Sequence, residues 1–204
     1  MLVSINPDNP QPHQIRKMAQ LLRDGRVICY PTDTVYGIGC DIFNKRAVER
    51  VFQIKRRAKD QPFSFMCSDL KDISQYAVVG NAAFRIMKKH LPGPYTFVLQ
   101  GTRIVPKIMV TKQKTVGVRV PDNRICLDLL AAFGGPIVTT SATKIGEEPP
   151  LVEAYQVEER LGKLVDAVID GGPVYPDPSS VISLIDDQVE VLREGKGDLT
   201  AFRL

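Results

Sequence analysis

The sequence predicts an α/β protein built around a mixed β-sheet. Segments with the periodicity of amphipathic helices alternate along the chain with short apolar segments that are typical of strands. The last two predicted strands, residues 180–185 and 190–193, follow each other through a short polar turn, which favours antiparallel pairing. A chain of 204 residues, 44% hydrophobic and 25% charged, is most simply one domain, 1–204, that buries roughly 70% of its unfolded surface.

The first predicted elements are a helix, a strand and a second helix. Residues 14–23 have helical spacing and Gly25 supplies the stop, while the apolar run 27–31 is typical of a strand. Asn44 is expected to cap the second helix, because its side chain can accept from a free backbone N–H of the first turn. The positions expected on the buried faces of the two helices are Ile15, Met18, Ala19, Leu22, Ala47, Val48, Val51, Phe52 and the stem of Lys55.

The central part of the chain continues the alternation. Residues 63–67 are expected to form a strand, and Asp69 to open a short helix. Asn81 is expected to cap a longer helix, which Pro92 closes because proline has no N–H to continue the helical ladder. The positions expected to face inward on this longer helix are Ala83, Phe84, Met87 and Leu91. Further strands are expected at 96–100, 115–120, 136–140 and 164–169, and further helices at 125–133 and 152–161.

Composition excludes several classes of protein. No run of 18 apolar residues occurs and the N-terminal segment lacks a signal pattern, so we expect a soluble, cytoplasmic protein with no membrane partner. The four cysteines form no CxxC pair, and His13 and His90 lie far apart without metal-ligand spacing, so no resident metal site is expected. The net charge of +4 permits a nucleotide or nucleic-acid partner and also serves solubility.

Two segments concentrate groups suited to anion binding. The strand at 27–31 ends in hydroxyl-bearing residues, Thr32 and Thr34, and the next helix ends in Lys55, Arg56 and Arg57. Cations in the last turn of a helix complement its dipole, and hydroxyls at a strand end can bond the local backbone. The alternative is a site that holds phosphates or carboxylates with guanidinium, ammonium and hydroxyl groups. The residues alone leave both interpretations open.

The order and spacing of these motifs resemble the YrdC/YciO family, the threonylcarbamoyl-AMP synthases of tRNA modification. The resemblance runs from about residue 27 to residue 197, and it is strongest to the YciO branch. The segments that carry it are Tyr30-Pro31-Thr32-Asp33-Thr34-Val35-Tyr36-Gly37, Lys55-Arg56-Arg57, Phe65-Met66-Cys67, Tyr95-Thr96-Phe97, Val118-Arg119-Val120, Thr140-Ser141-Ala142-Thr143 and Arg193-Glu194-Gly195. It implies a YrdC-like fold, an open twisted mixed β-sheet with flanking helices and a concave basic cleft.

The resemblance also implies a role for each matched residue. Catalytic stabilisation of the transferred phosphate would come from Lys55, Arg57 and Arg193. The threonine substrate would be held by Thr34, Arg119, Ser141 and Ser179. The nucleotide would be contacted by Lys55, Arg57, Gln61, Thr115, Thr143 and Arg193. Mg²⁺ would arrive with ATP, because the motifs include no metal ligands of their own.

Several positions depart from the pattern of the family. Thr143 and Gln61 each replace an asparagine, and Pro178 replaces a glutamate that often precedes the serine matched by Ser179. Met66 stands where many synthases have a histidine near the threonine, and Leu151 where a hydroxyl residue is usual. Each hydrogen bond lost to a bound polar group costs about 0.5–1.5 kcal/mol, so together these changes predict weaker ATP binding.

Three functions are therefore weighed. The first is a synthase that uses ATP, L-threonine and bicarbonate to form threonylcarbamoyl-AMP and pyrophosphate for t6A37 modification of tRNA, with activity lowered by the departures. The second is a protein that binds double-stranded RNA or tRNA through a basic cleft and has a degenerate nucleotide site. The third is an adenylating enzyme for a related substrate, with Met66 making the amino-acid pocket more apolar.

Overall fold

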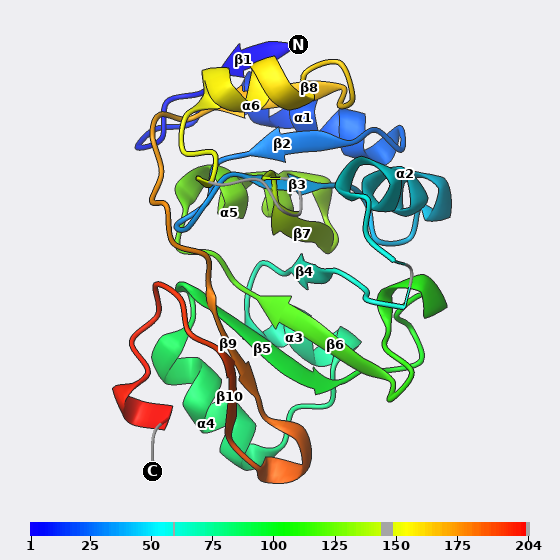
Figure 1. Ribbon diagram of the computed structural model, residues 1–204, viewed down its shortest axis with the longest axis vertical. Coiled ribbons are helices and arrows are strands. Elements are labelled where there is room, and N and C mark those ends of the chain that lie inside the picture. Colours follow the sequence, from blue (N-terminus) through cyan, green and yellow to red (C-terminus); the bar gives the residue numbers. More distant parts are fainter. Residues whose placement is uncertain (59, 144–148, 203–204) are drawn as a thin grey trace.

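A computed structural model describes residues 1–58, 60–143 and 149–202. In this part of the chain the strands form one ten-stranded sheet in the order β1-β8-β2-β3-β7-β4-β6-β5-β9-β10 (Figure 1). Parallel pairs, such as β2 with β8 and β4 with β6, alternate with antiparallel pairs, such as β3 with β7 and β9 with β10. The predicted mixed sheet with flanking helices is confirmed, and so is the antiparallel pairing of the last two strands.

The strands and helices are short and follow each other closely. The strands are β1 Leu2–Ser4, β2 Ile28–Tyr30, β3 Gly37–Gly39, β4 Ser64–Met66, β5 Tyr95–Gln100, β6 Thr115–Arg119, β7 Ile137–Ser141, β8 Ala167–Asp170, β9 Ser180–Ser183 and β10 Glu190–Arg193. The helices are α1 Pro12–Arg23, α2 Lys45–Lys55, α3 Leu70–Tyr76, α4 Asn81–His90, α5 Arg124–Phe133 and α6 Ala154–Leu161. None of the described helices is long and apolar enough to cross a membrane.

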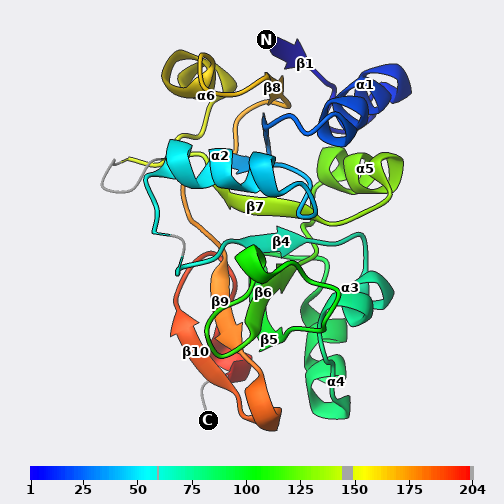
Figure 2. The same ribbon diagram turned by 90° about the vertical axis from the view of Figure 1, so that its right-hand side faces the viewer.

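Helices cover both faces of the sheet around β2 and β8 (Figure 2). Successive side chains of a strand point to opposite faces, so Ile28 and Tyr30 of β2 belong to one apolar cluster and Cys29 to another. The cluster of Ile28 and Tyr30 includes the buried faces of α1 and α5, and the cluster of Cys29 includes those of α2 and α6. These two layers fix the ends of β2, α2 and β7, from which several site residues extend.

The predicted helix faces and two of the predicted caps are confirmed. Ile15, Met18, Ala19 and Leu22 are the buried residues of α1. Asn44 caps α2 by accepting from the Ala47 backbone N–H at 3.0 Å, and Asp69 caps α3 by accepting from Asp72 at 2.7 Å. Both caps satisfy backbone donors that have no partner inside the helix.

Two predictions for α4 are wrong. The N-cap is Gly80, whose carbonyl accepts from the Phe84 N–H at 2.8 Å, so Asn81, the predicted cap, is instead the first residue of the helix. Phe84 is 45% exposed, because the buried face of α4 is the narrow one that carries Ala83 and Met87. Two short strands, β1 and β3, had not been predicted either.

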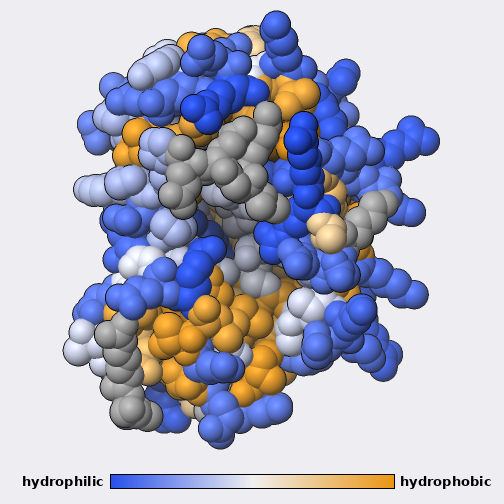
Figure 3. Space-filling view, in the orientation of Figure 1, coloured by the Kyte–Doolittle hydropathy of each residue, from blue (hydrophilic) through white to orange (hydrophobic). Residues whose placement is uncertain are grey.

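The edge of the sheet formed by β9 and β10 has a more apolar surface than the upper half of the face shown in Figure 3. The view in Figure 3 shows hydrophilic side chains over the upper half and an apolar area over β9 and β10 in the lower half. Leu192 of β10, the last strand of the sheet, is 50% exposed. The same two strands contribute Val181 and Arg193 to the lining of the pocket described next.

Candidate functional site

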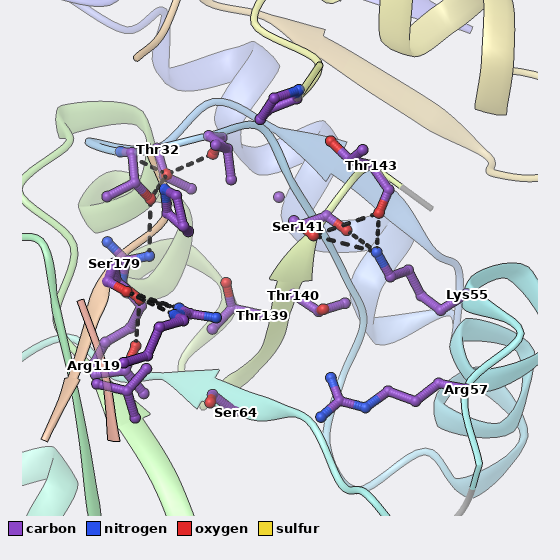
Figure 4. Close-up of a pocket in the computed structure, with 18 of the residues that line it drawn as sticks. Thr32, Lys55, Arg57, Ser64, Arg119, Thr139, Thr140, Ser141, Thr143 and Ser179 are labelled. Atoms are coloured by element: carbon purple, nitrogen blue, oxygen red, sulfur yellow. Dashed lines mark hydrogen bonds between the residues drawn. The ribbon is translucent and has the colours of Figure 1, made fainter. Parts of the chain in front are cut away.

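A pocket of about 480 Å³ lies where the loop after β2 and the ends of α2, β6, β7, β9 and β10 converge (Figure 4). Four cationic residues line it: Lys55, Arg57, Arg119 and Arg193. Hydroxyl residues from five segments complete the polar lining: Thr32, Thr34, Ser64, Thr96, Thr139, Thr140, Ser141, Thr143 and Ser179. The described lining residues include no aspartate or glutamate. The pocket is therefore suited to anions, as the two basic and hydroxyl-rich segments had suggested.

Arg119 is held at the back of the pocket by the loop that follows β2. Because Val118 and Val120 point into the apolar core, Arg119 points to the opposite face of β6. Its Nη2 donates to Asp33 Oδ1 at 2.5 Å, and its Nη1 donates to Thr34 Oγ1 at 3.2 Å. Both charged side chains are less than a tenth exposed. Arg119 Nε and Asp33 Oδ2 are buried without a hydrogen-bond partner in the described structure.

Lys55 joins the end of α2 to the end of β7. Its Nζ donates to the Ser141 carbonyl at 2.6 Å and to Ser141 Oγ at 3.3 Å, and it also contacts the Thr143 carbonyl (Figure 4). Lys55 is only 3% exposed. The ammonium group therefore faces β7 and the pocket, so complementing its own helix dipole is not its only role.

Arg57 extends into the pocket from the segment after α2 (Figure 4). Its guanidinium lies 5.2 Å from the centre of the Phe63 ring, a distance at which a cation is attracted to the ring face. Burial lowers the pKa of Arg57, and its Nε has no hydrogen-bond partner among the described residues. Arg56, the residue before it, is exposed and has a left-handed backbone with φ of 49°, which turns the chain so that Arg57 faces inward.

Arg193 and Ser179 form the opposite wall. Arg193 donates from Nε and Nη2 to the Ser179 carbonyl at 3.1 and 2.7 Å, and from Nη2 to Ser179 Oγ at 3.2 Å. Ser179 Oγ also lies 2.8 Å from Thr96 Oγ1. Burial lowers the pKa of Arg193, and the nearby charges of Arg119 and Arg57 lower it further. The pocket is thus a region of positive potential that is not fully compensated.

The structure brings together most of the predicted site residues but not all. The predicted residues that line the pocket are Thr34, Lys55, Arg57, Arg119, Ser141, Thr143, Ser179 and Arg193. Gln61 is exposed and lies outside the lining. Thr115, at the opposite end of β6 from Arg119, also lies outside it and bonds Thr111 Oγ1 at 2.6 Å. A nucleotide contact for Gln61 and Thr115 stays a prediction.

The expectation that Met66 borders the amino-acid pocket is wrong. Met66 is fully buried in the apolar cluster that α1 and α5 share with β2, and it is not part of the pocket lining. Leu151 is also buried, and its backbone N–H donates to Thr143 Oγ1 at 3.0 Å. Of the departures from the family pattern, Thr143 and Pro178 lie at the pocket itself.

Two neighbours of the site had not been predicted. Asp33 lies in a matched motif, but nothing in the sequence indicates that it pairs with an arginine 86 positions away. Lys196 donates to the Asp33 carbonyl at 2.6 Å, and its ammonium lies 3.3 Å from the centre of the Tyr175 ring. Lys196 thereby ties the loop after β10 to the segment that leads to Ser179. The sequence did contain one signal for Lys196: it lies between Gly195 and Gly197, and two glycines indicate a closely packed loop.

Comparison with known proteins agrees with the fold. The family model described as "Telomere recombination" (Sua5, YciO, YrdC) matches residues 20–195. The chain belongs to the Sua5/YciO/YrdC family. It is 44% identical over 199 residues to the uncharacterised protein YciO of Escherichia coli, with 97% of each chain covered. The crystal structure of E. coli YciO superposes with a TM-score of 0.95 at 43% identity and covers 100% of this chain and 99% of that one.

Two relatives whose names or titles indicate an activity or a ligand are less similar to the chain than E. coli YciO. A putative threonylcarbamoyl-AMP synthase of Methanocaldococcus jannaschii is 36% identical over 173 residues, 84% of this chain and 81% of that protein. The structure of Pyrococcus abyssi Sua5 complexed with L-threonine superposes with a TM-score of 0.89 at 30% identity. The superposition covers 96% of this chain and 57% of the P. abyssi chain.

Proposed function

We propose that the protein is an L-threonylcarbamoyladenylate synthase that uses ATP, L-threonine and bicarbonate and acts in the t6A37 modification of tRNA. The observation that carries the proposal is the pocket in which Arg119 and Ser179, the partner of Arg193, lie across from Lys55 and Arg57 (Figure 4). Such a pocket can hold an amino-acid carboxylate and a nucleotide phosphate close together, although the two repel each other in water. A family member that binds L-threonine in a similar fold supports the same ligand here.

The proposed reaction needs no nucleophile from the protein. Bicarbonate takes up a proton and loses water to give CO₂. The neutral threonine amine forms a bond from nitrogen to the carbon of CO₂, one C=O electron pair moves to oxygen, and one proton leaves the nitrogen for solvent to give a carbamate. A carbamate oxygen then attacks the α-phosphate of ATP and pyrophosphate leaves. The protein would contribute orientation and positive charge, which Arg57 and Arg193 supply at the phosphate and Arg119 at the carboxylate.

Mg²⁺ is proposed only as a companion of ATP. The described residues contain no cluster of three or more histidine, cysteine, aspartate or glutamate side chains that could hold a metal ion. Mg²⁺ would enter with ATP and supply positive charge at its phosphates.

The test of the proposal is pyrophosphate release from ATP by the purified protein with bicarbonate, with and without L-threonine. We expect threonine-dependent release, and threonylcarbamoyl-AMP detected by mass spectrometry. Release that does not depend on threonine would contradict the assigned amino acid and favour an adenylating enzyme for another substrate.

RNA binding without synthase activity is the second candidate. The observation that favours it is that Lys55, Arg119 and Arg193 already donate to acceptors of the protein, while Gln61 and Thr115 lie outside the pocket. A weak nucleotide site on a basic surface would leave tRNA or double-stranded RNA as the partner. No pyrophosphate release, together with RNA binding that weakens steeply as salt is raised, would favour this candidate.

Arg57→Gln should weaken nucleotide binding about 10- to 100-fold, because a charge-assisted bond to a phosphate contributes about 1.5–3 kcal/mol. The melting temperature should change little, since Arg57 Nε bonds nothing in the described structure. Arg193→Gln should lower both the nucleotide affinity and the melting temperature, because Arg193 also donates to Ser179 in the protein itself. Nucleotide titration and thermal unfolding measure the two effects.

The matched control is Arg56→Gln, which removes the same charge from an exposed neighbour outside the pocket. It should leave nucleotide binding within about two-fold, as expected for a single exposed charge. Equal weakening by Arg56→Gln and Arg57→Gln would mean that the phosphates do not reach the pocket.

A further inference from the structure

The hydroxyl groups of Thr32 and Thr34 have fixed roles as hydrogen-bond donors and acceptors. Thr32 Oγ1 lies 2.7 Å from the Val35 carbonyl, which can only accept, so the single proton of Thr32 is used there. Thr34 Oγ1 lies 3.0 Å from Thr32 Oγ1 and must therefore be the donor of that bond. Arg119 can only donate, so Thr34 Oγ1 accepts from Arg119 Nη1 at 3.2 Å.

It follows that Thr34 has no proton left for a ligand. A hydroxyl oxygen has two lone pairs, and Arg119 uses one, so Thr34 presents a single acceptor to the pocket that it lines. Next to this acceptor stands a guanidinium whose Nε has no partner. An acceptor beside a cationic donor is complementary to a ligand that carries an N–H or O–H group beside a carboxylate, as an α-amino or α-hydroxy acid does.

The charges around this position are mainly positive. The groups that face it are Lys55 at the end of α2, Arg57 after α2, Arg119 of β6, Arg193 of β10, Lys196 of the following loop, and Asp33 of the loop after β2. Asp33 is the one carboxylate of this set, and it is bound to Arg119 at 2.5 Å rather than directed into the pocket lining. The lowered pKa of Arg193, caused by burial and then by Arg119 and Arg57, reflects the same positive field.

We propose that this site binds its amino-acid substrate with the amine in the neutral form, hydrogen-bonded to Thr34 Oγ1, and expels the ammonium proton to solvent. A bound ammonium would meet several cations and no carboxylate of the described lining, whereas a neutral amine needs only one acceptor. The inference rests on the proposed function, because the neutral amine is the form that adds to CO₂. It gives the pocket a way to prepare the nucleophile without a general base.

The experiment is calorimetric titration of the protein with L-threonine, without nucleotide, in buffers of different ionisation enthalpy. Free α-amino groups have a pKa of about 7.7–8.0 or higher, so at pH 7 we expect release of between about 0.8 and one proton per threonine bound. The analogue with a hydroxyl in place of the α-amine should bind without proton release. Nucleotide phosphates would add negative charge, which is why the titration is made without them.

Two pairs of variants test the assigned groups. Thr34→Val should weaken threonine binding about 3- to 10-fold, the loss of one hydrogen bond, whereas Thr34→Ser keeps the acceptor and should bind within about two-fold of the unsubstituted protein. Thr140→Asp places a carboxylate in the lining and should suppress proton release, because the ammonium form is then stabilised. Its matched control, Thr140→Asn, has nearly the same size without the charge and should release more protons per threonine bound than Thr140→Asp.

The possible results separate this inference from the proposed function. Threonine binding without proton release, combined with threonine-dependent pyrophosphate release, would overturn the inference and leave the proposed function intact. Proton-releasing binding without pyrophosphate release would support the inference and overturn the function. Absence of binding by both threonine and its hydroxy analogue would overturn the inference, and pyrophosphate release would then judge the function independently.

Discussion

Gly39→Ala is expected to prevent formation of a stable native sheet. An alanine Cβ at this position would lie 1.9 Å from the Val138 carbonyl oxygen and 2.8 Å from the Tyr30 hydroxyl oxygen. The first contact is with the backbone of β7, which cannot move aside as the end of a flexible side chain could. The same carbonyl accepts from Tyr30 at 2.8 Å, so any displacement would also break a buried hydrogen bond.

The position of β3 in the sheet makes this clash consequential. β3 pairs with β2 on one side and β7 on the other, and it connects β1, β8 and β2 to the rest of the sheet. We expect the free energy of unfolding to fall by more than about 4 kcal/mol, in the range reached only by severe packing errors. Denaturant unfolding and the yield of folded protein measure the effect.

Gly135→Ala is the control for this prediction. An added Cβ there would meet only the Phe133 ring, at 3.4 Å, which is ordinary contact. Its effect should stay within about 1 kcal/mol. If Gly39→Ala were as mild as Gly135→Ala, the close approach of β3 to β7 would be wrong, and with it the wall of the pocket that these strands form.

Local features of the fold could be predicted because their causes are local. The cap of α2 by Asn44 depends on a backbone N–H three residues away, and the buried stripe of α1 on a spacing of three and four residues. β3 could not be predicted in the same way. Its sequence, Gly37-Ile38-Gly39, has two residues that disfavour strands. At Gly39 the Val138 carbonyl of β7 approaches too closely for a side chain, and at Gly37 an added Cβ would lie 2.8 Å from the Tyr30 ring.

The candidate site shows the same difference between local features, which could be predicted, and contacts between distant residues, which could not. Lys55 and Arg57 were suggested by their clustering, and family resemblance added Arg119, Ser179 and Arg193, all of which line the pocket. What they bond was not predictable, because the partners are distant in sequence: Lys55 and Ser141 are 86 positions apart. The burial of Met66 in the core is a similar case, since the sequence does not reveal that its side chain joins the apolar cluster of α1 and α5.

Arg119→Ala is expected to destabilise the protein and abolish threonine binding together. The substitution leaves the Asp33 carboxylate, only 7% exposed, without its partner. Removing one member of a buried ion pair costs about 3–5 kcal/mol, mainly because the remaining charge is buried and uncompensated. The cation proposed to hold the ligand carboxylate is lost at the same time. Thermal unfolding and threonine titration measure the two effects.

The double variant Asp33→Ala/Arg119→Ala separates the loss of stability from the loss of threonine binding. Removing both charges should restore a large part of the lost stability, because no uncompensated charge remains, whereas threonine binding should stay absent. Arg124→Ala, which breaks the exposed Arg124–Asp128 pair of α5, should change stability by less than about 1 kcal/mol. If the double variant bound threonine, Arg119 would serve only to neutralise Asp33, and the carboxylate would have to be held by Arg57 or Arg193 instead.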